Sequence, residues 1–108
     1  MSGLFINDGL TFKHTVEARG PIPELTVWYR PALAAEVYQW REEREAVKAA
    51  KRVSIDAAFL ATHLVKWSVT ESLTSAMLLK IHPRVLSDLI DAVTGYSMQG
   101  QEQETEGN

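Results

Sequence analysis

The stretch LTVWYRPALAAEVYQW, residues 25–40, decides the fold, because an alternating apolar pattern changes to a helical one at Arg30-Pro31. The alternating half places its apolar side chains on one face of a strand: Leu25, Val27 and Tyr29. A residue before proline is confined to extended geometry, and proline is favoured in the first helical turn. We therefore expect the strand to end at Arg30 and a helix to begin at Pro31.

The segment upstream predicts a partner strand. Residues 10–17, LTFKHTVE, alternate strictly, with one face formed by Leu10, Phe12, His14 and Val16. Between the two strands, residues 19–24, RGPIPE, contain a glycine and two prolines, which are typical of a loop. This pattern predicts an N-terminal β-hairpin. Because two strands alone are only marginally stable in water, the hairpin is expected to pack its apolar face on the helices that follow.

The first helical segment is expected to run from Pro31 to about Lys51. Its inward stripe contains Leu33, Val37, Trp40 and Val47, interrupted by Arg44. A second segment is expected to begin at an N-cap Ser54, with Asp56 in its first turn. Its stripe reaches the end of the segment: Ile55, Phe59, Leu60, His63, Leu64 and Trp67. No strong breaker lies between 51 and 55, so one continuous helix is an alternative.

Two further helices are expected near the C-terminus. Thr74 is a candidate N-cap for a short helix over 75–81. His82-Pro83 then starts a last helix, closed by Gly95, whose buried stripe contains Leu86, Leu89, Ile90 and Val93. The predicted fold class is thus α+β, an N-terminal β-hairpin followed by three or four amphipathic helices. We expect one globular domain over 1–95 and an acidic tail over 96–108, disordered from about Gln99.

Composition argues against several classes of function. The 108 residues contain no cysteine and no apolar run near the ~20 residues of a membrane span. The net charge of −3 comes from Glu102, Glu104 and Glu106, so residues 1–101 are neutral and lack the basic surface of a nucleic-acid binder. The one basic cluster, Lys48 to Arg52, is interpreted as the C-terminal end of a helix.

Candidate catalytic and metal-binding groups are sparse. His14, His63 and His82 have no second ligand at helical spacing, so they are interpreted as core or capping residues rather than metal ligands. Asp88 and Asp91 lie one turn apart and are interpreted as the polar face of the last helix. No glycine-rich phosphate loop and no nucleophile motif is present. The sequence predicts neither an enzyme nor a cofactor.

Three blocks carry a resemblance to a known family. They are FINDGLTFKHTVEA (5–18), VWYRPALAAEV (27–37), and ATHLVKWSV (61–69) taken with LTSAMLLKIHPRVLSDLIDAVTG (73–95). Together they resemble the small tail assembly chaperones of long-tailed bacteriophages and prophages. Ser68 departs from the acidic residue expected after Trp67. The resemblance implies a non-enzymatic factor in the host bacterial cytoplasm that binds the tape measure protein and assists tail tube protein to polymerise around it.

A chaperone of this kind needs exposed apolar or aromatic surface. Alternation places Tyr29 inside and Trp28 outside, and helical spacing places Trp40 inside and Tyr38 outside. The predicted partner-binding residues are therefore Trp28, Tyr38, Met77, Leu78 and Ile81. Coverage of Trp28 by the first helix or by the N-terminal segment is an equal alternative.

Other functions stay open at this point. A virion structural adaptor, such as a head–tail joining or tail terminator protein, is the main alternative, and a small regulatory binding module is a third. A homo-oligomer is compatible with the sequence.

Overall fold

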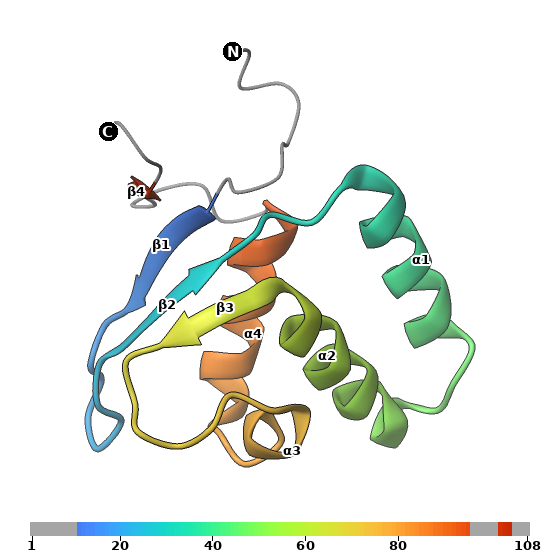
Figure 1. Cartoon of the computed structure of the whole chain (residues 1–108). Coiled ribbons are helices and arrows are strands. Elements are labelled where there is room, and N and C mark those ends of the chain that lie inside the picture. Colours follow the sequence, from blue (N-terminus) through green and yellow to red (C-terminus); the bar gives the residue numbers. More distant parts are fainter. Residues whose placement is uncertain (1–10, 96–101, 105–108) are drawn as a thin grey trace.

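Strands β1 (Thr11–Val16) and β2 (Leu25–Tyr29) form the expected antiparallel hairpin (Figure 1). The register pairs Phe12 with Tyr29 and His14 with Val27, so the inward faces coincide. A tight turn joins the strands, in which Arg19 and Ile22 exchange backbone hydrogen bonds and Gly20 has a φ of 56°. Glycine suits this position because it adopts positive φ without steric cost. The computed structural model describes residues 11–95 and 102–104, so Leu10 lies outside the described residues.

A third strand extends this sheet, which the sequence did not predict. Strand β3 (Leu64–Trp67) pairs antiparallel with β2, and the sheet order is β3-β2-β1-β4, where β4 is Glu102–Glu104. The α+β class is confirmed, but the helices do not follow the hairpin without interruption. The prediction that Leu64 and Trp67 continue a helical stripe is wrong, because helix α2 (Ala49–His63) ends at His63 and the chain then pairs with the edge of β2.

Helix α1 (Ala34–Glu45) begins later than Pro31. The Ala32 amide donates to the Val93 carbonyl at 3.0 Å, which ties the chain before α1 to helix α4 (Pro83–Thr94). Leu33 becomes the N-cap, and its amide donates to the Glu36 carboxylate at 2.7 Å. Leu33 is therefore 47% exposed and does not belong to the inward stripe.

Helix α2 (Ala49–His63) is separated from α1 by a short turn. Its N-cap is Lys48, so the prediction of an N-cap at Ser54 is wrong. The basic cluster, predicted at the C-terminal end of the first helix, lies at the start of α2. One of its residues still binds the C-terminal end of α1, because the Arg52 Nε donates at 2.9 Å to the Arg44 carbonyl in the last turn of that helix.

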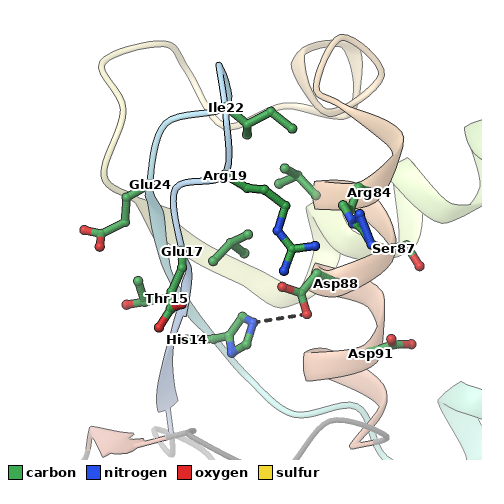
Figure 2. Close-up of a pocket in the computed structure, with 12 residues that line it drawn as sticks. His14, Thr15, Glu17, Arg19, Ile22, Glu24, Arg84, Ser87, Asp88 and Asp91 are labelled. Atoms are coloured by element: carbon green, nitrogen blue, oxygen red, sulfur yellow. Dashed lines mark ion pairs between the residues drawn. The ribbon is translucent and has the colours of Figure 1, made fainter.

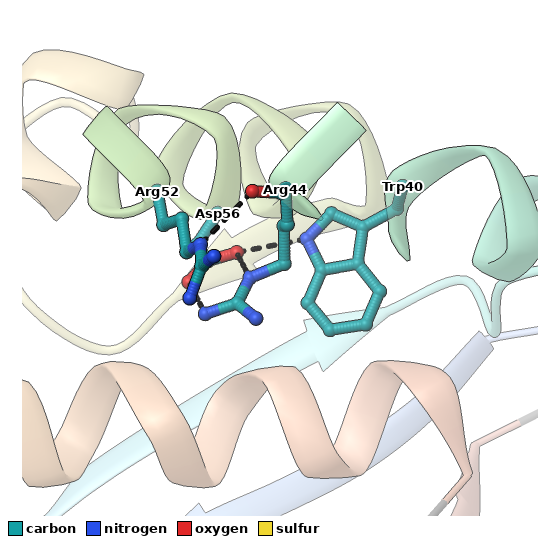
Figure 3. A network of polar contacts seen from close by, with 4 residues as sticks. All are labelled: Trp40, Arg44, Arg52 and Asp56. Carbon is teal, nitrogen blue, oxygen red and sulfur yellow. Dashed lines mark hydrogen bonds and ion pairs between the residues drawn. The ribbon is translucent and has the colours of Figure 1, made fainter. Parts of the chain in front are cut away.

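A polar network joins α1 to α2 at this turn (Figure 3). The Asp56 Oδ1 accepts hydrogen bonds from the Trp40 Nε1 at 2.8 Å and from the Arg44 Nε at 2.7 Å. The Arg44 Nη2 donates to Oδ2 at 3.3 Å, and the guanidinium carbon lies 5.3 Å from the Trp40 ring centroid. Arg44, which interrupts the apolar stripe in the sequence, is thus the partner of a buried carboxylate.

Two further helices follow β3. Helix α3 (Ser75–Leu78) is capped by Thr74 as predicted, since the Thr74 Oγ1 accepts from the Met77 amide at 3.2 Å. Helix α4 (Pro83–Thr94) lies behind the strands in Figure 1. The predicted stripe of α4 is confirmed, because all four residues are buried: Leu86, Leu89, Ile90 and Val93.

A short strand lies within the predicted tail. Strand β4 (Glu102–Glu104) pairs antiparallel with the outer edge of β1, and its register places Glu102 opposite Lys13. Unpaired backbone groups on an edge strand favour such an addition. The rest of the predicted tail, residues 96–101 and 105–108, lies outside the described residues.

Gly95 ends α4 with a φ of 88°, in the left-handed region. Alanine pays a steric cost in this conformation, so we expect Gly95→Ala to lower the free energy of unfolding by about 1 kcal/mol. Chemical denaturation measures the change. Ala92→Gly, inside the same helix, is the reverse exchange and serves as a comparison. Unchanged stability of Gly95→Ala would contradict the assigned C-terminal geometry of α4.

Candidate binding site

An apolar pocket lies where three segments meet. The hairpin loop, the end of β3 with the residues after it, and α3 with the residues after it all contribute. The pocket encloses about 230 Å³, and its apolar walls are formed by Ile22, Leu25, Trp67, Val69, Met77 and Ile81. Charged residues also line the pocket: Glu24, Glu71 and Lys80. An apolar centre with a polar rim is the usual anatomy of a protein-binding patch.

The walls of the apolar pocket are held in place by the fold. The Trp67 Nε1 donates at 2.7 Å to the Glu71 carbonyl, which ties the indole to the loop that follows β3. Trp67, Met77 and Ile81 are half-buried, and Val69 is 40% exposed. The volume is smaller than the roughly 300–1,000 Å³ of sites that enclose a drug-sized ligand. A pocket of this size fits apolar side chains of a partner segment.

The pocket contains two of the predicted partner-binding residues, Met77 and Ile81. The prediction that Leu78 binds a partner is wrong, because Leu78 is fully buried in the core and cannot contact a partner in this fold. The physical reason is that α3 rests on the core, where α2 contacts it, and Leu78 is its one buried residue. The short helix therefore does bury an apolar side chain, and exposes only its other positions.

Trp28 lies on the outer face of the sheet and is half-buried. Lys13 and Lys66 are its neighbours in register on the two adjoining strands, and the Lys66 Nζ lies 4.6 Å from the Trp28 ring centroid. This cation–π contact covers part of the indole. Tyr38 on α1 is 65% exposed. Neither residue lines the apolar pocket, so the structure does not unite the five predicted residues in one surface.

A second, more polar groove lies between β1 and α4 and encloses about 710 Å³ (Figure 2). His14 of β1 points across it to Asp88 of α4, with 3.6 Å between Nε2 and Oδ1. His14 is 7% exposed, and neither ring nitrogen has a hydrogen-bond partner among the residues that the structure describes. The sequence predicted His14 as a core or capping residue and Asp88 on the polar face of the last helix, but not their pairing.

His63 of α2 and Glu36 of α1 lie close to each other. The His63 Nδ1 is 2.9 Å from the Phe59 carbonyl, and its Nε2 is 3.4 Å from the Glu36 Oε1. The Leu33 amide, with His63 as a further contributor, lowers the pKa of Glu36 against the opposing effect of burial. Burial raises the pKa of Tyr29 to about 12. Across residues 11–95 and 102–104, no three side chains gather as ligands for a metal ion.

The sequence did not indicate that Ile22, Trp67 and Val69 line one apolar pocket. The one signal in the sequence was that all three are apolar residues in or beside loops. Exposed apolar side chains indicate a binding surface when they form a contiguous patch, and not when they occur singly. Within the described part of the chain, no helix is long and apolar enough to span a membrane.

Comparison of the chain with protein-family models, with curated proteins and with solved structures found no match.

Proposed function

We propose that the chain is a non-enzymatic tail assembly chaperone of a long-tailed bacteriophage or prophage. It acts in the host bacterial cytoplasm without a cofactor, binds the tape measure protein, and assists tail tube protein to polymerise around it. The proposal combines the resemblance of the three sequence blocks with one structural observation, the apolar pocket walled by Trp67, Val69 and Met77.

The pocket supports a helical client. Its walls are mainly apolar, and charged residues of both signs also line it: Glu24, Glu71 and Lys80. An amphipathic helix binds such a surface through apolar anchors at i, i+3 and i+4, while its polar face stays in water. A tape measure protein, as the resemblance describes it, supplies long apolar helical segments of this kind.

The test uses two valines of similar exposure in neighbouring positions. Val69 lines the pocket and is 40% exposed, whereas Val65 in β3 lies outside it and is 48% exposed. Val69→Lys places an ammonium group in the apolar centre, so we expect it to weaken binding of a tape measure fragment by about 2 kcal/mol, the scale of an interface hot spot. Val65→Lys should change binding by less than about 0.5 kcal/mol.

Coexpression shows whether the fragment stays soluble, and isothermal titration measures its affinity. The fragment should stay in the soluble fraction with the wild-type chain and with Val65→Lys, and precipitate with Val69→Lys, while circular dichroism shows all three chaperones folded. If Val65→Lys alone abolished protection of the fragment, the result would indicate that the client binds the outer sheet face near Trp28. If the wild-type chain protects no tape measure segment and is found stoichiometrically in purified particles, the chaperone proposal fails in favour of a virion adaptor.

A further inference from the structure

A groove runs between helices α1 and α2, which lie side by side in Figure 1. Side-chain contacts align the two helices antiparallel: Glu36 with His63, Trp40 with Phe59, and Arg44 with Asp56. The residues of α1 that line the groove recur at i, i+3, i+4 and i+7 between Glu36 and Glu43, which is a length of about two turns or roughly 10 Å. This α1–α2 groove encloses about 510 Å³.

Apolar side chains from both helices line the α1–α2 groove. They are Trp40 of α1 and, on α2, Ile55, Ala58 and Phe59. Trp40 is buried, whereas Ile55 and Phe59 are half-buried and Ala58 is exposed. The Phe59 ring is held between two others, since its centroid lies 5.1 Å from that of Trp40 and 4.5 Å from that of His63. The groove therefore presents a fixed apolar surface that a partner can reach.

The charged groups that line the groove are two carboxylates and one imidazole, with no lysine or arginine among them. The Glu36 carboxylate already has partners, because the Leu33 amide donates to it at 2.7 Å and the His63 Nε2 lies 3.4 Å away. The Glu43 Oε2 accepts a long hydrogen bond of 3.4 Å from the Gln39 Nε2. Glu43 is exposed and forms no ion pair within the described residues. It leaves a carboxylate beside the apolar surface for a cation from outside.

The walls of the groove favour a helical occupant. Inside an α-helix the backbone groups bond to one another, so α1 and α2 offer no strand edge on which an extended segment could add. A helix brings its own backbone bonds and packs lengthwise between two others, as in helix bundles. Its apolar stripe would contact α2, and a basic residue beside the stripe would reach α1.

We propose that the α1–α2 groove binds an amphipathic helix of a partner protein that carries lysine or arginine beside its apolar stripe. Apolar side chains of this helix pack on Ile55, Ala58 and Phe59, and one cationic side chain binds the Glu43 carboxylate. The inference does not depend on the tape measure protein or on the apolar pocket, because the groove and the pocket share no lining residue.

A synthetic peptide with leucine at i, i+3, i+4 and i+7 and lysine beside this stripe tests the proposal on the full chain. A length of about 20 residues is needed, since shorter isolated helices are marginal in water. We expect the peptide to bind, and Glu43→Lys to weaken binding about tenfold or more, because repulsion replaces attraction. Glu45→Lys makes the same charge change at an exposed position of α1 outside the groove. It should weaken binding less than about threefold, since salt screens charges beyond about 8 Å.

A second pair of variants tests the apolar contacts. Ala58→Lys places a long cationic side chain inside the groove, and Ala50→Lys places one at an exposed position of α2 outside it. We expect Ala58→Lys to weaken binding about tenfold or more and Ala50→Lys less than about threefold, while circular dichroism shows both variants folded. The amide resonances that shift on binding should lie in residues 36–43 and 54–63.

Three results would overturn the proposal. The first is failure of the leucine–lysine peptide to bind at millimolar concentration. The second is equal binding of a peptide with glutamate in place of lysine, or equal weakening by Glu43→Lys and Glu45→Lys, which would show that the groove does not recognise a cation. The third is a dimer of the chain in sedimentation that Ala58→Lys dissociates, because a second copy would then occupy the groove in place of a different protein.

Discussion

Trp40→Ala is expected to lower the free energy of unfolding by about 3–5 kcal/mol, the range measured when a packed aromatic side chain is removed. Trp40 is 8% exposed, and its ring stacks on Phe59 with 5.1 Å between the centroids. Removing the indole leaves a cavity between α1 and α2 and takes one hydrogen-bond donor from Asp56. The loss is a large part of the ~5–15 kcal/mol that stabilises a typical domain.

Urea denaturation followed by circular dichroism measures this effect, with Tyr38→Ala as the matched control on the same helix. Tyr38 is 65% exposed, so its replacement should change stability by no more than about 0.5 kcal/mol. Trp67→Ala should fall between the two, at about 1–2 kcal/mol, because Trp67 is half-buried at the wall of the apolar pocket. Equal losses for Trp40→Ala and Tyr38→Ala would mean that α1 does not pack through Trp40.

The hairpin and the last helix could be predicted from the sequence because each has one clean period. Strict alternation gave β1 and β2, and the His82-Pro83 and Gly95 signals bounded α4. Strand β3 could not be found in this way. Its register shifts between Trp28 and Tyr29, so Val65 is an extra residue that breaks the alternation of Leu64 and Trp67. The remaining spacing of three residues then matches a helix equally well.

The break between α1 and α2 could not be predicted from the local sequence either. Neither glycine nor proline stands between Glu45 and Ala49, so local sequence offers no reason to stop. Contacts across the turn favour the break, since Arg44 binds Asp56 and Arg52 binds the Arg44 carbonyl. Such tertiary interactions override helix propensity, which is a weak signal at any one position.

The candidate site was predictable only in part for a similar reason. Met77 and Ile81 could be nominated because α3 is short, but the pocket also needs Ile22 and Trp67 from distant parts of the chain. Leu78 was misplaced because a four-residue helix has too few turns to reveal its buried side. Tyr29 and Trp40, by contrast, lie in long periodic segments, and both are buried as predicted.

Removal of the Asp56 carboxylate should lower the free energy of unfolding nearly as much as removal of the Trp40 indole. Asp56 is 9% exposed and holds three donors, the Trp40 Nε1 and two nitrogens of Arg44. Asp56→Ala leaves these donors without an acceptor, and removal of one partner from a buried ion pair costs about 3–5 kcal/mol. The Arg44 side chain is 34% exposed, and water can therefore solvate part of the guanidinium. We expect a loss near the lower limit, about 3 kcal/mol.

A double-mutant cycle with Arg44→Met separates the ion pair from simple packing, because methionine keeps an apolar stem of similar length without the charge. If Arg44 and Asp56 stabilise the turn as a pair, the double variant should be more stable than the sum of the two single losses predicts, by about 1–2 kcal/mol. Glu42→Ala, at an exposed position on α1, controls for the loss of one acidic side chain and should be nearly neutral. Strictly additive losses would show that the two side chains do not interact, and the end of α1 would then need another cause than the carboxylate of Asp56.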